Sequence, residues 1–276
     1  MVCGTTFGGA MISNSQWQIG LELQPSGLRA VGLQYRHYRW RLCRWWHIPF
    51  STGDSASCAA PFPRQAVQAL ASWRKSLPYR YRLQVSFPAL RTLQQQVVMP
   101  DCILREDQLQ HYIERAATAQ IALPGEPLAW DYTCNAPGPV RVTGVRQSDI
   151  QHLATLLRDA RLVARCIAPD ASALLCFMAH MPAPFEWLVH REQGHWLWAG
   201  DGRWGAELSD DPQGLAAWCQ RRGIDPDTVA FSSALAEDAA CVTFSPWWAI
   251  PGLSPPLPAC AGLFTVATGL ALGGQD

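Results

Sequence analysis

Cysteine and histidine are the residue types that most directly suggest metal or redox chemistry in this sequence, which has ten cysteines and seven histidines. Zinc and redox sites draw their ligands from pairs close together in sequence, such as C-x-x-C or H-E-x-x-H. No such pair occurs, because both residue types are scattered singly along the chain. His190 and His195 flank one predicted turn and could share a metal, although surface imidazoles on turns are far commoner. We predict no metal site, and free, mostly buried thiols that fit a reducing compartment, the cytoplasm.

Acid and nucleophile chemistry has two further candidates. Ser86 lacks the flanking glycines that give a nucleophilic serine its sharp turn. Asp170 follows Pro169 at the predicted start of a helix, where the helix dipole favours a carboxylate. Lys75 is the only lysine, which excludes the Gly-Lys-Ser/Thr run of a Walker loop. These patterns predict that the chain is not an enzyme.

Residues 17–31, WQIGLELQPSGLRAV, could hold phosphate. A short apolar strand enters a turn with Pro25, Ser26 and Gly27, and a second strand leaves it. Strand–turn–strand units of this shape open the chains of sugar kinases, chaperone ATPases and actins, where the turn holds nucleotide phosphates. The elements around this segment decide whether it belongs to such a fold.

The order of predicted elements repeats along the chain. Short runs joined by tight connections predict strands at 17–23, 28–35 and 38–48, the third of which also shows period-two alternation, and a helix is predicted at 64–77. Three short strands within 185–208 and a helix at 212–222 repeat this order, although the residues hardly match. Hydrophobic residues make up 49% of the chain and charged residues 16%, which is typical of a globular protein. We predict an α/β fold of two lobes.

A different unit lies between the two repeats. Strands are predicted at 81–87, 91–99, 128–134, 140–145 and 162–168, and helices at 105–120, at 149–160 with Ser148 as its cap, and from Pro169 onward. The uncharged run 259–272 is about fourteen residues long, short of the roughly twenty that cross a membrane. It predicts a buried helix.

Four segments, in this order and spacing, carry a family resemblance: residues 17–31, VSFPALRTLQQQVVMP at 85–100, RQSDIQHLATLLRDARLVARCIAPDASALLCFM at 146–178, and FTVATGLALGG at 264–274. The chain resembles the PilM family of actin-like proteins of type IV pilus assembly. Within that family it looks most like the enterobacterial HofM branch, which is linked to the use of external DNA. The resemblance covers about 250 residues, from Trp17 to the end.

The resemblance implies an actin-like ATPase (ribonuclease H-like) fold of two lobes with a small inserted α+β subdomain. It places lobe I at 17–168. Residues 1–16 lack the basic region and continuous apolar core of a signal peptide, so a flexible extension is expected there, with Met11 as an alternative start. The inserted subdomain is expected at about 82–134, lobe II at 169–258, and a C-terminal helix packing back on lobe I at 259–276. The family binds ATP between the lobes.

The residues at the expected nucleotide loops differ from those of nucleotide-binding members, which have Asp, Gly, Ser and later Lys at the first loop. Glu22, Gln24, Ser26 and Arg29 stand at these places. Gln24 puts a side chain where the backbone must come close, and Pro25 removes an N–H donor. An ordinary hairpin is the favoured interpretation of this turn.

The two later loops depart further. His190 stands where the family has Asp, and Glu192 stands at a glycine position, where its carboxylate would repel phosphate. The adenosine loop after Val229 offers Ser232 and Ser233 but no glycine. We expect vestigial loops, no ATP hydrolysis, and no cofactor. The alternative is an ATP-dependent switch or weak ATPase in which Glu22 holds Mg²⁺.

The family resemblance also implies a partner. PilM-like proteins dock a short peptide from the cytoplasmic N-terminus of a bitopic inner-membrane protein, PilN, called HofN in this branch. By analogy, Arg91, Tyr112 and Ile113 beside the inserted subdomain are the candidate groove residues. We predict a non-catalytic cytoplasmic scaffold that is held at the inner membrane through this partner and joins other pilus assembly components. Its formal charge of zero argues against direct nucleic acid binding.

Tryptophan is unusually frequent, with thirteen residues. Trp40, Trp73 and Trp218 are predicted to fill the core. Of the adjacent residues Trp247 and Trp248, one is expected at the surface or at an interface, because neighbouring side chains point in opposite directions.

Overall fold

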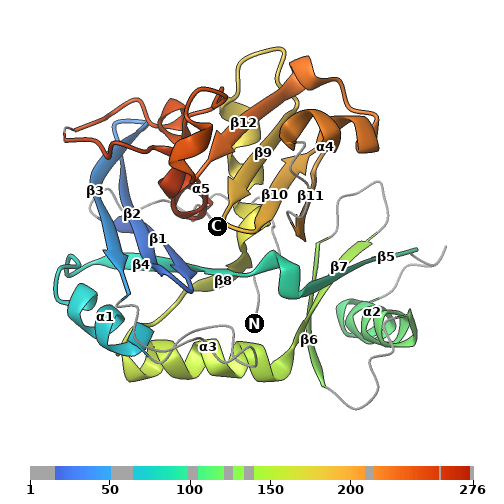
Figure 1. The fold of residues 1–276 in the computed structure, drawn as a ribbon. Helices are drawn as coiled ribbons and strands as arrows, with labels where there is room; N and C mark the ends of the chain where they lie inside the picture. Colours follow the sequence, from blue (N-terminus) through green and yellow to red (C-terminus); the bar gives the residue numbers. More distant parts are fainter. Residues whose placement is uncertain are drawn as a thin grey trace.

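Three β-sheets organise the molecule in the computed structural model, which describes residues 16–50, 65–98, 105–120, 127–133, 140–208, 214–254 and 256–273. Figure 1 shows a five-stranded sheet on the left, a four-stranded sheet at the upper right and a three-stranded sheet at the lower right. Residues 1–15 of the predicted extension lie outside the described residues. The expected α/β class with mixed sheets is confirmed.

The five-stranded sheet has the order β3-β2-β1-β4-β8. Its antiparallel meander confirms the first three predicted strands, and β4 and β8 add in parallel to β1 and β4. The apolar residues Ile19, Leu21 and Leu23 alternate on one face and pack with helices α1 and α3 in one core. Its elements are β1 (Trp17–Gln24), β2 (Gly27–Arg36), β3 (Arg39–Pro49), α1 (Gln65–Arg74), β4 (Tyr81–Phe87), α3 (Gln147–Asp159) and β8 (Cys166–Pro169).

The four-stranded sheet repeats the meander, as predicted, in the order β11-β10-β9-β12. Helix α4 covers one face through buried Trp218, which packs against Trp187 and Trp198. The elements are β9 (Trp187–Glu192), β10 (His195–Gly200), β11 (Arg203–Leu208), α4 (Gly214–Arg222) and β12 (Val229–Ser233).

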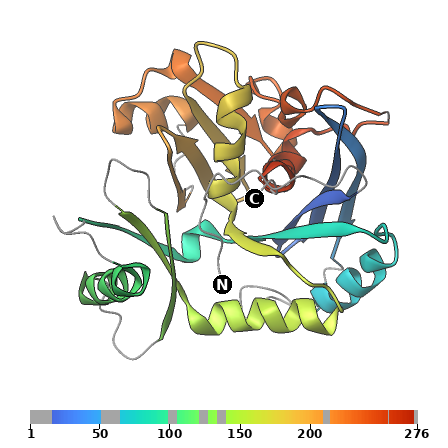
Figure 2. The same cartoon turned by 180° about the vertical axis from the view of Figure 1, so that it is seen from behind.

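The three-stranded sheet, in the order β5-β7-β6, forms the inserted unit with one covering helix, α2. Its core contains Val97, Ile113, Val140 and Val142. The predicted boundaries of 82–134 need correction, because β4 pairs inside the five-stranded sheet whereas β7 pairs with β5 and β6. The unit spans β5 (Thr92–Val97), α2 (Glu106–Gln120), β6 (Leu128–Thr133) and β7 (Val140–Arg146), preceded by a short 3-10 helix, η1 (Ala89–Arg91). In Figure 2, α3 runs from this unit to α1.

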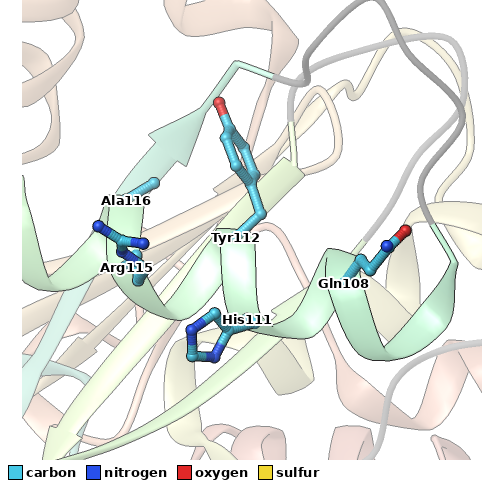
Figure 3. A pocket seen from close by; sticks show the side chains of 5 residues that line it. All are labelled: Gln108, His111, Tyr112, Arg115 and Ala116. Carbon is cyan, nitrogen blue, oxygen red and sulfur yellow. The ribbon is translucent and has the colours of Figure 1, made fainter.

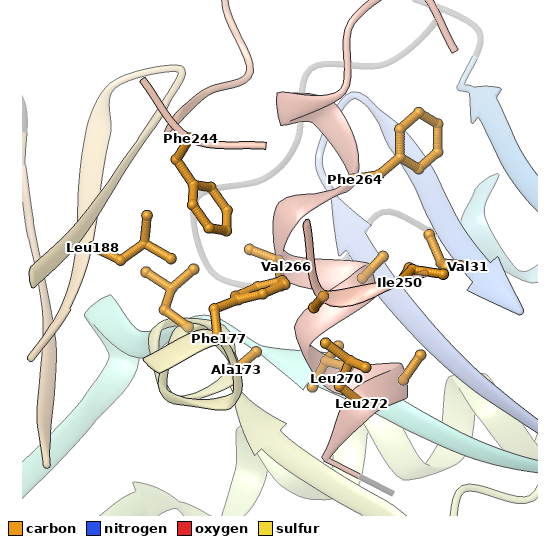
Figure 4. Packing of buried hydrophobic residues seen from close by; sticks show 14 of the residues in the cluster. Val31, Ala173, Phe177, Leu188, Phe244, Ile250, Phe264, Val266, Leu270 and Leu272 are labelled. Carbon is orange, nitrogen blue, oxygen red and sulfur yellow. The ribbon is translucent and has the colours of Figure 1, made fainter. Parts of the chain in front are cut away.

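Helix α5 (Thr265–Leu272) and the 3-10 helix η2 (Asp170–His180) lie between the five-stranded and four-stranded sheets. In Figure 4, Phe177, Leu188 and Phe244 approach α5 from one side, and Val31 and Ile250 from the other. A Cβ added at Gly20 would overlap the carbonyl oxygen of Ala267, so glycine allows α5 to approach β1. One continuous apolar core therefore joins the two sheets.

Several predicted boundaries are wrong. Helix α3 begins at Gln147 with Arg146 at its cap position, so Ser148 lies inside the first turn. The strand predicted at 162–168 begins only at Cys166, because the N–H of Leu162 still donates to the carbonyl of Leu157 after α3. The chain from 170 forms a 3-10 helix, η2, and the helix predicted at 259–272 begins at Thr265, after another 3-10 turn, η6 (Gly262–Phe264).

The tryptophan predictions are confirmed. Trp40, Trp73 and Trp218 are buried. Trp247 is buried and Trp248 half-exposed, within the 3-10 helix η5 (Pro246–Ala249). The six described cysteines have free thiols, but the expectation that most are buried is wrong: only Cys219 is buried, Cys241 is exposed, and the other four are partly exposed. No helix of the described chain has the length and apolarity that crossing a bilayer requires.

Candidate functional site

A buried polar network occupies the position of the expected nucleotide loops, where β1 and β2 face β9 and β12. Glu22 and Arg29 stand opposite each other in the register of β1 and β2, and both are buried. His190 and Glu192 lie two residues apart on β9, so their side chains share one face. Residues far apart in sequence thus meet between the two sheets.

Arg29 is the link between the sheets. Its Nη1 donates to Oε1 of Glu192 at 2.6 Å, and its Nη2 donates to Oε2 at 3.3 Å. Its Nη1 also lies 3.5 Å from Oε1 of Glu22, which accepts a 2.7 Å hydrogen bond from Nε2 of Gln24. Such two-point pairing of guanidinium and carboxylate is the geometry that makes an ion pair strong.

His190 continues the network into β12 and α5. Its Nε2 lies 3.0 Å from Oε1 of Glu192, and its Nδ1 lies 3.1 Å from Oγ of Ser232. The Ser232 hydroxyl is in turn 2.8 Å from Oγ1 of Thr265, at the start of α5. A ring with its proton on Nε2 donates to the carboxylate and accepts from Ser232, whose oxygen then accepts from Thr265. The alternative of a metal shared by His190 and His195 is therefore wrong, because both ring nitrogens of His190 are already bonded.

The two carboxyl groups around Arg29 are in opposite protonation states. Burial raises the pKa of Glu22 from 4.5 to about 8, although the charge of Arg29 opposes this rise. Burial acts in the same direction on Glu192, but the hydrogen bond from His190 and the charge of Arg29 outweigh it and lower the pKa to about 2. At neutral pH Arg29 is a cation and Glu192 an anion, and the raised pKa of Glu22 keeps its proton in place.

Asp170 lies at the start of η2, as predicted, and also ties two elements together. Its Oδ1 accepts hydrogen bonds from the backbone N–H groups of Ala89 at 2.9 Å and Ala171 at 2.7 Å. Burial raises its pKa to about 7 in spite of these bonds. The carboxyl group links η1, at the entrance to the inserted unit, to η2.

The residues of the network do not fit nucleotide phosphates. The guanidinium of Arg29 is already bonded to Glu192, whose carboxylate would repel a phosphate placed beside it. Ser26 is exposed at the tip of the β1–β2 turn, and its carbonyl accepts a bond from the N–H of Phe50. The hydroxyl of Ser232 is already hydrogen-bonded to His190 and Thr265. The polar groups that could meet a phosphate mostly bond to one another instead, and Oε2 of Glu22 is the atom of this network that has no hydrogen-bond partner among the described residues.

Sequence reasoning located most of this network but not its role. Five of the six predicted loop residues, Glu22, Gln24, Arg29, His190 and Ser232, come together, whereas Ser26 lies apart on the exposed turn. Glu192 appeared only as an obstacle to phosphate and is the partner of Arg29. Thr265 was missed, because nothing in its sequence surroundings indicates contact with β12.

The candidate groove residues divide between two places. Arg91, on η1 just before β5, donates to both carboxylate oxygens of Asp149 at 3.1 Å. Tyr112, on α2, is half-exposed, and its hydroxyl donates to the carbonyl of Val98 at 3.0 Å. Ile113 is buried in the core of the inserted unit, so its assignment to a surface groove is wrong.

Tyr112 borders a pocket on the outer side of α2 (Figure 3), in which its ring stands up from the helix. Gln108, His111, Arg115 and Ala116 complete the described lining. The hydrogen bond to Val98 places the ring beside the end of β5, and β5 is an edge strand of its sheet. An edge strand and an adjacent pocket can together receive an extended peptide.

Comparison with known proteins identifies relatives of this architecture. No family model matches the sequence. The chain is 31% identical over 258 residues to the DNA utilization protein HofM of Escherichia coli (strain K12), covering 93% of this chain and 97% of that protein. The matched chain of the PilM–PilN type IV pilus biogenesis complex has a TM-score of 0.67 at 16% identity, covering 94% of this chain and 98% of that chain.

A second solved structure extends the comparison. The cytoplasmic domain of EpsL, an inner membrane component of the type II secretion system of Vibrio cholerae, has a TM-score of 0.58 at 14% identity, with 93% of this chain and 94% of that chain covered. At such identities the two structures establish the fold alone, and the expected actin-like ATPase fold is confirmed. From its identity and coverage with HofM, the chain belongs to the HofM branch of the PilM-like family.

Proposed function

We propose that this protein is a non-catalytic scaffold of a pilus or secretion-type assembly at the inner membrane, and that it works without nucleotide. The observation that carries the proposal is the Arg29–Glu192 pair, which joins the five-stranded and four-stranded sheets across 163 residues of sequence. In an ATP-dependent relative of this fold, the nucleotide would bridge the lobes at this place. Here the side chains of the protein itself form the bridge.

A continuous apolar core supports the same proposal. Helix α5 packs on β1 and η2, and the aromatic rings of Phe177 and Phe264 fill the space on either side. A protein that opens and closes around a ligand needs a cleft between its lobes. The buried network and the core of α5 favour one fixed arrangement, which suits a scaffold.

The partner of the scaffold is proposed to be the N-terminal cytoplasmic peptide of a PilN-like membrane protein, because the related pilus complex pairs PilM with PilN. The edge strand β5 and the pocket beside Tyr112 form its docking groove. A six-residue strand, Thr92–Val97, offers roughly 20 Å of backbone for pairing with an extended peptide. Arg91 lies just before one end of this strand, and Val98 with Tyr112 at the other. The protein would thus be cytoplasmic and reach the membrane through this partner.

Fluorescence anisotropy with a labelled peptide of the partner's cytoplasmic N-terminus tests the groove. Tyr112→Ala is expected to weaken binding about tenfold or more, because aromatic anchors at interfaces cost over 1 kcal/mol when truncated. Tyr79→Ala, which removes an exposed tyrosine far from the inserted unit, is the matched control and should bind as the unaltered protein does. Equal affinity of both variants would move the groove elsewhere, and no binding by the unaltered protein would remove the proposed partner.

A further inference from the structure

One end of the five-stranded sheet gathers segments that are distant in sequence. The parallel strands β1, β4 and β8 begin at this end, where Trp17 is in register with Tyr81. Across the antiparallel strands, Trp17 is also in register with Gln34, which pairs with Arg41. Residues 34–41, 72–82 and 156–166 therefore lie along one side, which is the left side of Figure 1 and the right side of Figure 2. We call this side the basic end.

The basic end concentrates positive charge in a chain whose formal charge is zero. Its three segments hold ten arginine or lysine residues and one acid, Asp159. Among the described residues, seven of these cations are exposed and take part in no ion pair: Arg39, Arg41, Arg74, Lys75, Arg80, Arg158 and Arg161. Because the segments lie along the same side, their charges face the same partner when it approaches from there.

Three apolar or aromatic tips protrude among these charges. Tyr38 is 93% exposed, Tyr79 is 97% exposed and Val163 is 82% exposed. Tyr38 lies in the turn between β2 and β3, Tyr79 in the connection from α1 to β4, and Val163 in the connection from α3 to β8. Single exposed apolar residues are common, but here each of the three stands among exposed cations on the same side, and this combination suits an interaction surface.

A hollow of about 500 Å³ lies beside the third tip. Its lining is mostly apolar, and Arg158 and Arg161 also border it. Apolar walls under guanidinium groups match a ligand that is hydrophobic at one end and anionic at the other. A phospholipid of the anionic class has this chemistry.

We propose that the basic end docks on the anionic surface of a lipid bilayer. The arginines meet lipid phosphates, and Tyr38, Tyr79 and Val163 enter the headgroup region, where amphipathic rings and apolar tips are favoured. A nucleic acid would also attract the arginines, but Val163 and the apolar hollow would contribute nothing against a phosphate backbone. The inference does not rest on the proposed peptide groove, which belongs to another part of the molecule.

Co-sedimentation of the full chain with lipid vesicles tests the proposal. Vesicles of phosphatidylcholine with about a third phosphatidylglycerol should bind the protein, and pure phosphatidylcholine vesicles should not. The triple variant Arg39→Gln/Arg80→Gln/Arg158→Gln takes one charge from each segment. Each charge contributes about 1 kcal/mol to binding, and 1.4 kcal/mol corresponds to a factor of ten in affinity. Loss of three charges should therefore weaken binding on the order of 100-fold.

The control triple variant is Arg105→Gln/Arg115→Gln/Arg203→Gln, which makes the same change of net charge with exposed arginines elsewhere. It should bind anionic vesicles within about threefold of the unaltered protein. Equal losses in the two triple variants would overturn the proposal, because they would report net charge and not the basic end. Absence of vesicle binding by the unaltered protein would overturn it as well.

A second variant separates lipid from nucleic acid. Tyr79→Ser/Val163→Ser keeps every charge and should weaken vesicle binding severalfold, whereas binding to duplex DNA would not depend on these tips. Unchanged vesicle binding by this variant would refute insertion of the tips. Binding to duplex DNA that falls in the first triple variant, without vesicle binding, would assign the basic end to nucleic acid instead.

Discussion

Removing only one partner of the Arg29–Glu192 ion pair should destabilise the protein strongly. Arg29→Met removes the guanidinium whose two hydrogen bonds, at 2.6 and 3.3 Å, satisfy Glu192. Glu192 is only 3% exposed, and its pKa of about 2 depends on Arg29 as well as on His190, so the variant leaves a buried carboxylate that either lacks its cation or must take up a proton. An uncompensated buried charge of this kind costs about 3–5 kcal/mol. Urea unfolding followed by tryptophan fluorescence at neutral pH measures the loss.

Removing both partners should recover most of that loss. The double variant Arg29→Met/Glu192→Met buries two apolar side chains of similar size and leaves no charge unpaired, so its stability should lie within about 1–2 kcal/mol of the unaltered protein. The two single changes are therefore expected to be non-additive, with a coupling energy of roughly 3 kcal/mol. His190 loses one hydrogen-bond partner in the double variant, which accounts for the remaining cost.

Arg203→Met is the matched control, because it breaks an ion pair with Asp201 in which both side chains are more than half exposed. That change should cost under about 1 kcal/mol. The reasoning would be refuted if Arg29→Met cost no more than Arg203→Met. It would also be refuted if the losses of the two single variants simply added in the double variant, since Arg29 and Glu192 would then not depend on each other.

Two further predictions concern Glu22 and Gly20. Because the pKa of Glu22 is raised to about 8 from 4.5, the native state keeps a proton that the unfolded chain releases, and this residue lowers the free energy of unfolding as pH rises through that window. In urea unfolding, the free energy of unfolding of Glu22→Gln should therefore rise by roughly 2–4 kcal/mol relative to that of the unaltered protein between about pH 5 and pH 8. Parallel pH profiles of the two proteins would contradict this prediction, because they would show that Glu22 ionises in the native state as it does in the unfolded chain. Gly20→Ala should cost about 3 kcal/mol or more, because its Cβ would overlap the backbone of α5, whereas Gly194→Ala meets open space at a positive φ and should cost about 1 kcal/mol. Similar losses at the two glycines in thermal unfolding would contradict the close packing of α5.

Local patterns in the sequence were enough to predict most elements. Apolar runs between turn residues located the two meanders, and both sheets are buried on two faces, with α5 and η2 packed between them. Boundaries failed where long-range contacts decide them. Leu162 is apolar and reads as part of a strand, yet it is buried in the core beneath α3, and the strand begins only where β8 pairs with β4.

The candidate site was predictable in its members but not in its chemistry. Family positions pointed to Glu22, Arg29, His190 and Ser232, and these residues do converge. Their mutual bonding depends on the packing of β1 and β2 against β9 and β12, which no local pattern encodes. The error at Ile113 has another source, because the apolar spacing of Leu109, Ile113 and Ala116 indicates a buried helix face, and only the family analogy placed Ile113 at the groove.

The central claim is that a partner peptide binds without nucleotide. Calorimetric titration of the purified protein with a synthetic peptide of the PilN-like partner's cytoplasmic N-terminus tests it directly, once alone and once with ATP and Mg²⁺. We predict the same dissociation constant in both titrations, because the network of Arg29, Glu192 and His190 already joins the two sheets. Binding that appears only when ATP and Mg²⁺ are present would contradict the account, since nucleotide would then be needed to form the docking state.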